Sequence, residues 1–197
     1  MNQPLQAELL EMRDADLNLR QQLADQGALF GEYNEQMAAL HRRNNERFAE
    51  ILAEHGWPDR QLVGEEGSEA AWLVLQHAVL NPELMRRAIS LLEESVNAGN
   101  TEPRYLALAT DRVRTLEGRH QVYGTQHDWD ESGQISPLPI EDPDNVDRRR
   151  AVVGLEPLIE STKRLRARAQ EEGELPPADL DAHRRGAREW AQSVGWS

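Results

Sequence analysis

Polar side chains stand in two short segments where an ordinary protein core would use Leu or Val. The first is Gln76-His77-Ala78, inside an otherwise apolar stretch, and the second is Gln-Val-Tyr-Gly-Thr-Gln over residues 121–126. A buried amide or imidazole without a partner costs roughly 1–3 kcal/mol. Several such groups in apolar surroundings therefore indicate either a shared polar network or the lining of a pocket.

The first segment contains a candidate acid/base. His77 shares a helix face with Leu73 and Val74, and an imidazole held there by a hydrogen-bond acceptor can exchange a proton near neutral pH. Histidines that only pack in a core are common, so a purely structural role is the competing interpretation. We predict His77 as the general acid/base and Gln76 as a residue that orients the substrate.

The second segment offers hydroxyl and amide groups. If residues 120–125 form a strand, the side chains of Tyr123 and Thr125 lie on the same face. Gly124 between them fits either a bulge or close approach of a ligand to the backbone. We predict Tyr123 as a second catalytic residue, with Thr125 as a hydroxyl donor and Gln126 as a further substrate-orienting amide.

Charged residues could complete such a site. Asp111-Arg112 fits either a surface ion pair or the charged rim of a pocket. The dense basic cluster at residues 148–150 would fan over about 200° of a helix, so at most one or two of its side chains can point inward. An inward Arg150 could bind an anion through two parallel hydrogen bonds. We predict that the following residues converge on one pocket, with Arg112 or Arg150 pairing with the substrate's anion: Gln76, His77, Asp111, Arg112, Tyr123, Thr125 and Gln126.

The elements that must position these residues are mostly helical. Hydrophobic periodicity and helix-stop residues predict a helical bundle with a small antiparallel β-meander inserted at about residues 113–140. The meander has candidate strands at 113–116, 120–125 and 134–138. Predicted helices cover residues 3–26, 30–55, 69–80, 82–98, 101–113, 145–153, 155–170 and 177–193.

One domain is the expectation for 197 residues. We predict a single α-rich domain over residues 1–170, in which an N-terminal antiparallel pair of helices at 3–55 precedes a motif-bearing core at 50–160. Residues 171–197 are predicted to form a linker and a C-terminal helix. Phe30 and Tyr33 are predicted to begin the apolar stripe of the second helix.

Composition excludes several classes of function. A formal charge of -13 disfavours nucleic acid, because binding a phosphate backbone needs a positive surface. Neither a leader segment nor an apolar run of about 20 residues is present, so we expect a cytoplasmic protein with no membrane contact. The chain has no cysteine, which excludes disulfides, thiolate metal sites and a cysteine nucleophile. The oligomeric state stays open.

Metal or cofactor binding is not the primary prediction. A transition-metal site needs two or three imidazole or carboxylate ligands, and none of the predicted helices contains a His-x-x-x-His or Glu-x-x-His spacing that would supply them. His77, Asp111 and His127 form the set considered for a metal-dependent alternative. The sequence also lacks a Gly-x-Ser-x-Gly elbow, a phosphate-binding Gly-Lys-Ser/Thr loop and a dinucleotide-binding fingerprint.

Taken in order, the motifs resemble a widespread bacterial family of unknown function with Gln-His-Ala and Tyr-Gly-Thr-Gln signatures. The residues that carry the resemblance lie at about 50–160. The resemblance implies no particular activity, but it favours a common site for the signature residues and separates His77 from the other histidines. The first 28 residues and the tail after Gln170 lie outside it. The ordered motifs are His55-Gly-Trp-Pro58, Gly64, Gln76-His-Ala78, Asp111-Arg-Val113, Gln121-x-Tyr-Gly-Thr-Gln126 and Arg150-x-x-x-Gly-Leu155.

Two classes of function fit these features. The preferred prediction is an enzyme that uses His77 for acid/base chemistry on a small polar substrate bearing an amide or a carboxylate, without a cofactor. The alternative is a non-catalytic acidic module that binds a partner protein, as an inhibitor or immunity protein does, with the polar residues forming a closed structural network. An open cavity at His77 would favour the enzyme.

Overall fold

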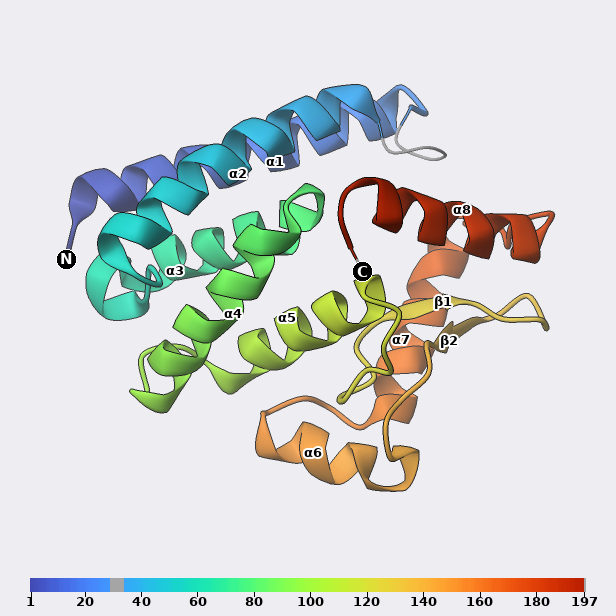
Figure 1. The fold of residues 1–197 in the computed structure, drawn as a ribbon. Coiled ribbons are helices and arrows are strands. Elements are labelled where there is room, and N and C mark those ends of the chain that lie inside the picture. The colour runs from blue at the N-terminus through green and yellow to red at the C-terminus, as the bar shows by residue number, and fades with distance from the viewer. Residues whose placement is uncertain (29–33, 197) are drawn as a thin grey trace. The chain divides into compact units, whose positions relative to one another are not determined.

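The computed structural model describes residues 1–28 and 34–196 and is mostly helical, as predicted (Figure 1). It divides into two compact units, Met1–Thr101 and Glu102–Ser197. The boundary between them lies inside the region predicted as one domain. Phe30 and Tyr33 lie outside the described residues. The first unit contains α1 (Gln3–Asp25), α2 (Glu35–His55), α3 (Arg60–Gln76), the 3-10 helix η1 (Ala78–Leu80) and α4 (Pro82–Asn97).

The helices α1 and α2 form the predicted antiparallel pair and run side by side in Figure 1. Contacts between distant residues fix the direction, because Glu8 bonds Arg47 near one end of the pair and Asp16 bonds His41 further along. A stripe of apolar side chains on α1 is buried in this unit, together with the apolar face of α2. The buried apolar residues are Leu5, Leu9, Met12 and Leu23 on α1, and Met37, Ala38, Leu40, Phe48, Ile51 and Leu52 on α2.

The third helix begins earlier than predicted. Residues 64–68, which precede the helix predicted at 69–80, lie within α3. This helix starts after Asp59 because the Asp59 carboxylate accepts hydrogen bonds from the backbone N–H groups of Gln61 and Leu62. Gly64 interrupts the helix with a φ of 73°, a conformation that favours glycine. The helix ends at Gln76, and His77 is its C-terminal cap.

The second unit contains the only β-structure among the described residues. Two short strands pair in antiparallel fashion, with His127 opposite Pro137 and Trp129 opposite Ile135. The elements of this unit are α5 (Pro103–Leu116), β1 (His127–Trp129), β2 (Ile135–Pro137), the 3-10 helix η2 (Pro143–Asn145), α6 (Val146–Val152), α7 (Leu158–Glu171) and α8 (Leu180–Ser193).

Two of the three predicted strands are therefore wrong in detail. Residues 113–116 form the last turn of α5, because the buried residues Ala109 and Val113 continue one helical stripe until Gly118 ends it at a φ of 70°. Residues 120–125 form a loop whose one β-bridge among the described residues joins Gln121 to Ile140. The expected alternation of side chains across a strand does not apply to this loop.

Candidate functional site

A cluster of one carboxylate and two imidazoles lies in the first unit. The Oδ2 atom of Asp16 is 2.6 Å from Nε2 of His41 and 2.8 Å from Nδ1 of His77. The two rings lie side by side, with their centroids 5.1 Å apart. Each residue comes from a different element, since Asp16 is on α1, His41 on α2 and His77 at the end of α3. We call these three residues the Asp-His-His cluster.

The Asp-His-His cluster is buried on one side and open on the other. Asp16 and His41 are only 1% and 5% exposed, whereas the side chain of His77 is 30% exposed. Burial alone would raise the pKa of Asp16, but the hydrogen bonds and charges of His41 and His77 outweigh it and hold this pKa well below its usual range. Asp16 is therefore a carboxylate that accepts hydrogen bonds from both rings.

One oxygen of this carboxylate is left over. The Oδ1 atom of Asp16 is buried and has no hydrogen-bond partner within the described part of the chain. A buried charged oxygen without a partner is costly. Gln76, next to His77 in sequence, is also buried, and its Nε2 donor has no partner among the same residues. This unit thus contains both an acceptor and a donor that its own fold does not use.

The two ring nitrogens of His77 differ, because Nδ1 bonds Asp16 and Nε2 does not. If Nδ1 carries the proton and donates it to Asp16, then Nε2 has a free lone pair. No residue within 1–28 or 34–196 makes a hydrogen bond to Nε2 of His77. A carboxylate that orients a histidine and stabilises its protonated form is the arrangement found in many acid/base catalysts.

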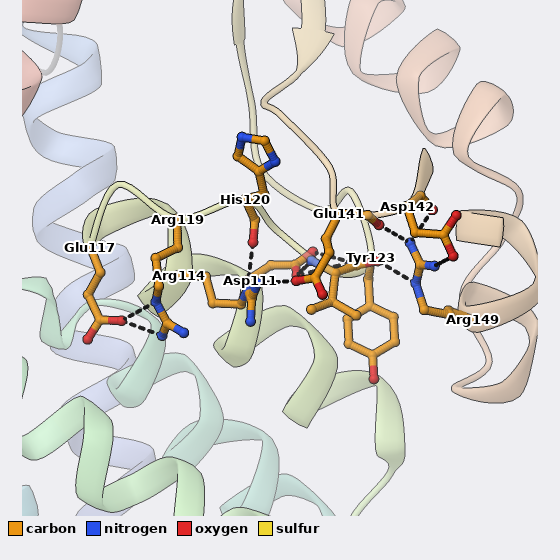
Figure 2. Close-up of polar contacts among 10 residues, drawn as sticks. Asp111, Arg114, Glu117, Arg119, His120, Tyr123, Glu141, Asp142 and Arg149 are labelled. Atoms are coloured by element: carbon orange, nitrogen blue, oxygen red, sulfur yellow. Dashed lines mark hydrogen bonds and ion pairs between the residues drawn. The ribbon is translucent and has the colours of Figure 1, made fainter. Parts of the chain in front are cut away.

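Asp111, predicted to bind substrate, organises the Tyr-Gly-Thr-Gln loop of the second unit. Its carboxylate is fully buried and accepts hydrogen bonds from the backbone N–H groups of Val122, Tyr123 and Thr125 at 2.7–3.1 Å. The hydroxyl of Thr125 also donates to it, at 3.0 Å. Figure 2 shows the carboxylate against the backbone of this loop, with the ring of Tyr123 extending away from it.

Arginine side chains bind the carbonyl groups of the same loop. Arg150 is buried and donates to the carbonyl oxygens of Tyr123, Gly124 and Glu156 at 2.6–3.3 Å. Arg149 donates to the carbonyl oxygen of Val122 at 2.8 Å and to those of Glu141 and Asp142 (Figure 2). The inward arginine predicted from sequence is thus Arg150, and the groups that it binds are main-chain carbonyls of its own unit.

Packing explains the glycine of this loop. Gly124 has a φ of 67°, and a Cβ added there would lie 2.8 Å from Cδ1 of Ile140 and 2.9 Å from Cδ1 of Leu158. Of the two interpretations left open by the sequence, close approach of a ligand is unnecessary, because the protein's own side chains fill the space.

The glutamines of the loop also bind its main chain. Gln121 is fully buried and donates to the carbonyl oxygens of Gln126 and Leu138, while its own oxygen accepts from the N–H group of Gln126. The side chain of Gln126 donates to the hydroxyl of Thr125 at 3.1 Å. These contacts close the loop on itself and leave the side chain of Thr125 already bound on both sides.

Two predicted site residues keep unused polar atoms. Tyr123 is half-buried, and burial followed by the charge of Asp111 raises the pKa of its phenol. Its hydroxyl makes no hydrogen bond to any residue that the structure describes. The Nε atom of Arg112, on α5, is likewise buried without a partner among them. Neither group takes part in the network around Asp111.

The residues predicted to converge on one pocket are divided between the two units. Gln76 and His77 belong to the first unit, and the other predicted residues belong to the second. Within the second unit, Asp111, Thr125, Gln126 and Arg150 do come together. Asp111 is already saturated by backbone donors, which makes it a poor metal ligand, and His127 bonds the hydroxyl of Thr162 at 3.0 Å.

Sequence reasoning missed two members of the Asp-His-His cluster. Asp16 continues the spacing of Leu5, Leu9 and Met12. A carboxylate on such an apolar stripe indicates a buried polar group. His41 continues, through Met37, the spacing of the predicted stripe that begins at Phe30 and Tyr33. Neither signal identifies a partner, because residues 16, 41 and 77 are far apart in sequence.

The fold and the Asp-His-His cluster define a helical protein with a buried carboxylate-histidine centre. The chain belongs to the family of unknown function DUF6624, which it matches over residues 3–170. This match is longer than the predicted resemblance at 50–160 and includes α1, which supplies Asp16. No curated protein and no solved structure matches the chain. Among the described residues, no helix is long and apolar enough to cross a membrane.

Proposed function

We propose that this protein is an enzyme in which His77 acts as general acid/base on a small polar substrate. The observation that carries the proposal is the 2.8 Å contact between Nδ1 of His77 and the buried carboxylate of Asp16, on a histidine whose side chain is 30% exposed. A histidine that served only to fill the core would have no need of an exposed edge. The exposed edge is where a substrate could meet the ring.

Asp16 and His41 are positioning residues in this proposal. The carboxylate of Asp16 selects the ring form of His77 that is protonated on Nδ1, and its negative charge stabilises the imidazolium formed when Nε2 takes a proton. His41 donates a second hydrogen bond to the same oxygen at 2.6 Å and so fixes the carboxylate between the two rings. Helices α1 and α2 supply the rigid support for this arrangement.

The substrate class follows from the unused donor near His77. The amide of Gln76 is buried and offers an N–H group that the described chain leaves without an acceptor. A carbonyl or carboxylate oxygen of a substrate would satisfy it. We therefore propose substrates that bear an amide or a carboxylate. Tyr123 remains a predicted hydroxyl donor, whereas Asp111, Thr125, Gln126 and Arg150 are assigned to loop structure.

An activity screen with matched histidine variants tests the proposal. The full-length protein would be assayed against a panel of small amides and carboxylate-bearing compounds, with hydrolysis and elimination products read by mass spectrometry. For any active compound, His77→Gln should lower turnover about a hundredfold or more, because positioned proton transfer contributes about 10²–10⁴ in rate. His120→Gln, at an exposed histidine outside the signature motifs, is the control and should keep full activity. A fully active His77→Gln protein would refute the assignment.

A further inference from the structure

We infer that Asp16, His41 and His77 bind one divalent transition-metal ion, with Zn²⁺ as the ion that fits them best. One possible ligand atom from each residue lies within 4.8 Å of the other two. Two imidazole nitrogens and one carboxylate oxygen form a donor set that zinc enzymes use, with a water completing the tetrahedron. The inference rests on the proposed function only in that both concern the Asp-His-His cluster; metal binding does not require His77 to act as an acid/base.

The unused oxygen of Asp16 is an independent reason for a ligand. Asp16 is only 1% exposed, yet its Oδ1 atom has no hydrogen-bond partner in the described chain. One nitrogen of each ring, Nε2 of His41 and Nδ1 of His77, instead contacts the same atom, Oδ2. A cation between the three side chains would neutralise the buried charge and could be bound by either carboxylate oxygen. Hydrogen bonds from two neutral rings neither neutralise the charge nor give Oδ1 a partner.

The geometry needs only a small expansion to accept the ion. Tetrahedral ligands at the usual zinc distances are about 3.3 Å apart, whereas the carboxylate oxygen now lies 2.6 and 2.8 Å from the two nitrogens. Rotations of the three side chains can supply this difference. Because the ligands come from three separate helices, the metal would also tie α1, α2 and the end of α3 together.

Metal binding would change which group transfers the proton. With Nδ1 of His77 bound to zinc, the base and nucleophile is a water on the ion, whose pKa falls to about 7 in zinc enzymes. For an amide substrate, zinc-bound hydroxide adds to the carbonyl carbon, the C–N bond then breaks, and the hydroxide proton passes to the leaving nitrogen. The products are a carboxylate and an amine.

Zinc titration of the full-length protein tests this inference. The protein would be freed of any affinity tag, dialysed against a chelator and titrated with ZnCl₂ by calorimetry. We expect one site per chain with a dissociation constant of roughly 1 μM or tighter, since zinc sites in proteins bind strongly. Co²⁺ should bind the same site and show the visible absorption of a four-coordinate ion.

Variants separate a built site from weak binding to acidic surface groups. His77→Gln and Asp16→Asn should each weaken zinc binding at least tenfold and abolish the Co²⁺ spectrum. Asp14→Asn, two residues from Asp16 on the exposed face of α1, and His120→Gln, at an exposed histidine of the other unit, should bind as the parent protein does. His77→Gln is the decisive variant if Asp16→Asn fails to fold. Absence of stoichiometric binding, or binding unchanged in His77→Gln, would overturn the inference.

Activity measurements distinguish this inference from the proposed function. If the chelator-treated protein turns over substrate and His77→Gln does not, the proposed function stands and the metal site is refuted. If zinc binds through all three residues but no His77 variant changes turnover, the metal site stands and the proposed function is refuted. Activity that appears only with added metal, and is lost in His77→Gln, supports the metal site and an enzyme, but contradicts His77 itself as the general acid/base.

Discussion

Replacing Asp111 by Asn should unfold the Tyr-Gly-Thr-Gln loop more readily, because this carboxylate is the acceptor for the loop's backbone. Its two oxygens accept from three N–H groups and one hydroxyl. Asn keeps one oxygen and replaces the other by an NH₂ group. In the best arrangement the N–H groups of Val122 and Tyr123 keep their acceptor, the hydroxyl of Thr125 turns to accept, and the N–H group of Thr125 is left without one.

The size of the effect follows from these contacts. One orphaned buried N–H costs about 1–3 kcal/mol, and the remaining hydrogen bonds lose the extra strength that a charged acceptor gives. We expect Asp111→Asn to lower the free energy of unfolding by about 2–4 kcal/mol. Asp111→Ala should lower it by about 4–6 kcal/mol, because all four donors lose their acceptor. These are large fractions of the 5–15 kcal/mol that stabilises a typical domain.

Urea unfolding combined with amide hydrogen exchange measures this prediction. Exchange in a peptide spanning residues 118–128 should accelerate in Asp111→Asn. The control is Asp144→Asn, because Asp144 is exposed in the same unit and should change stability by less than about 0.5 kcal/mol. If Asp111→Asn is as stable as the control and exchanges equally slowly, the structural role is refuted. Asp111 would then be free to serve as the substrate ligand predicted from sequence.

Two further predictions concern the same unit. Gly124→Ala should destabilise it by about 1–3 kcal/mol, since the residue has a φ of 67° and its Cβ would lie 2.8 Å from Ile140; an unchanged urea midpoint would contradict this. Burial lowers the pKa of His127 below its ordinary 6.5, so the unfolded chain takes up the proton more readily and stability falls as pH drops through about 6.5. His127→Gln should flatten the difference in unfolding free energy between pH 7.5 and 5.5, whereas an unaltered pH dependence would show that His127 does not cause it.

Much of the fold could be read from the sequence, because helix periodicity and stop residues act locally. The paired helices α1 and α2 are where the spacing of apolar residues placed them. The errors arose where one residue type fits two structures. Val113 suits a strand by propensity, yet it continues the buried stripe of α5, and packing along that helix decides its conformation.

The candidate site was less accessible to sequence reasoning. His77 and Gln76 were identified because polar groups interrupt an apolar segment. The roles of Asp111 and Arg150 could not be identified in this way. Both side chains bind main-chain groups, which every residue has regardless of its type. Asp16 was visible as a carboxylate on an apolar stripe, but nothing in its local sequence points to a histidine 61 residues away.

The ring forms of His41 and His77 test the central claim most directly and require no substrate. Two-bond ¹H–¹⁵N correlation spectra of the metal-free protein report which imidazole nitrogen carries the proton. We predict protonation of Nδ1 in His77 and of Nε2 in His41, each donating to Asp16, with both preferences weakened in Asp16→Asn and retained in Asp14→Asn. A His77 ring protonated on Nε2, with Nδ1 unprotonated and indifferent to Asp16→Asn, would contradict the proposed catalytic centre.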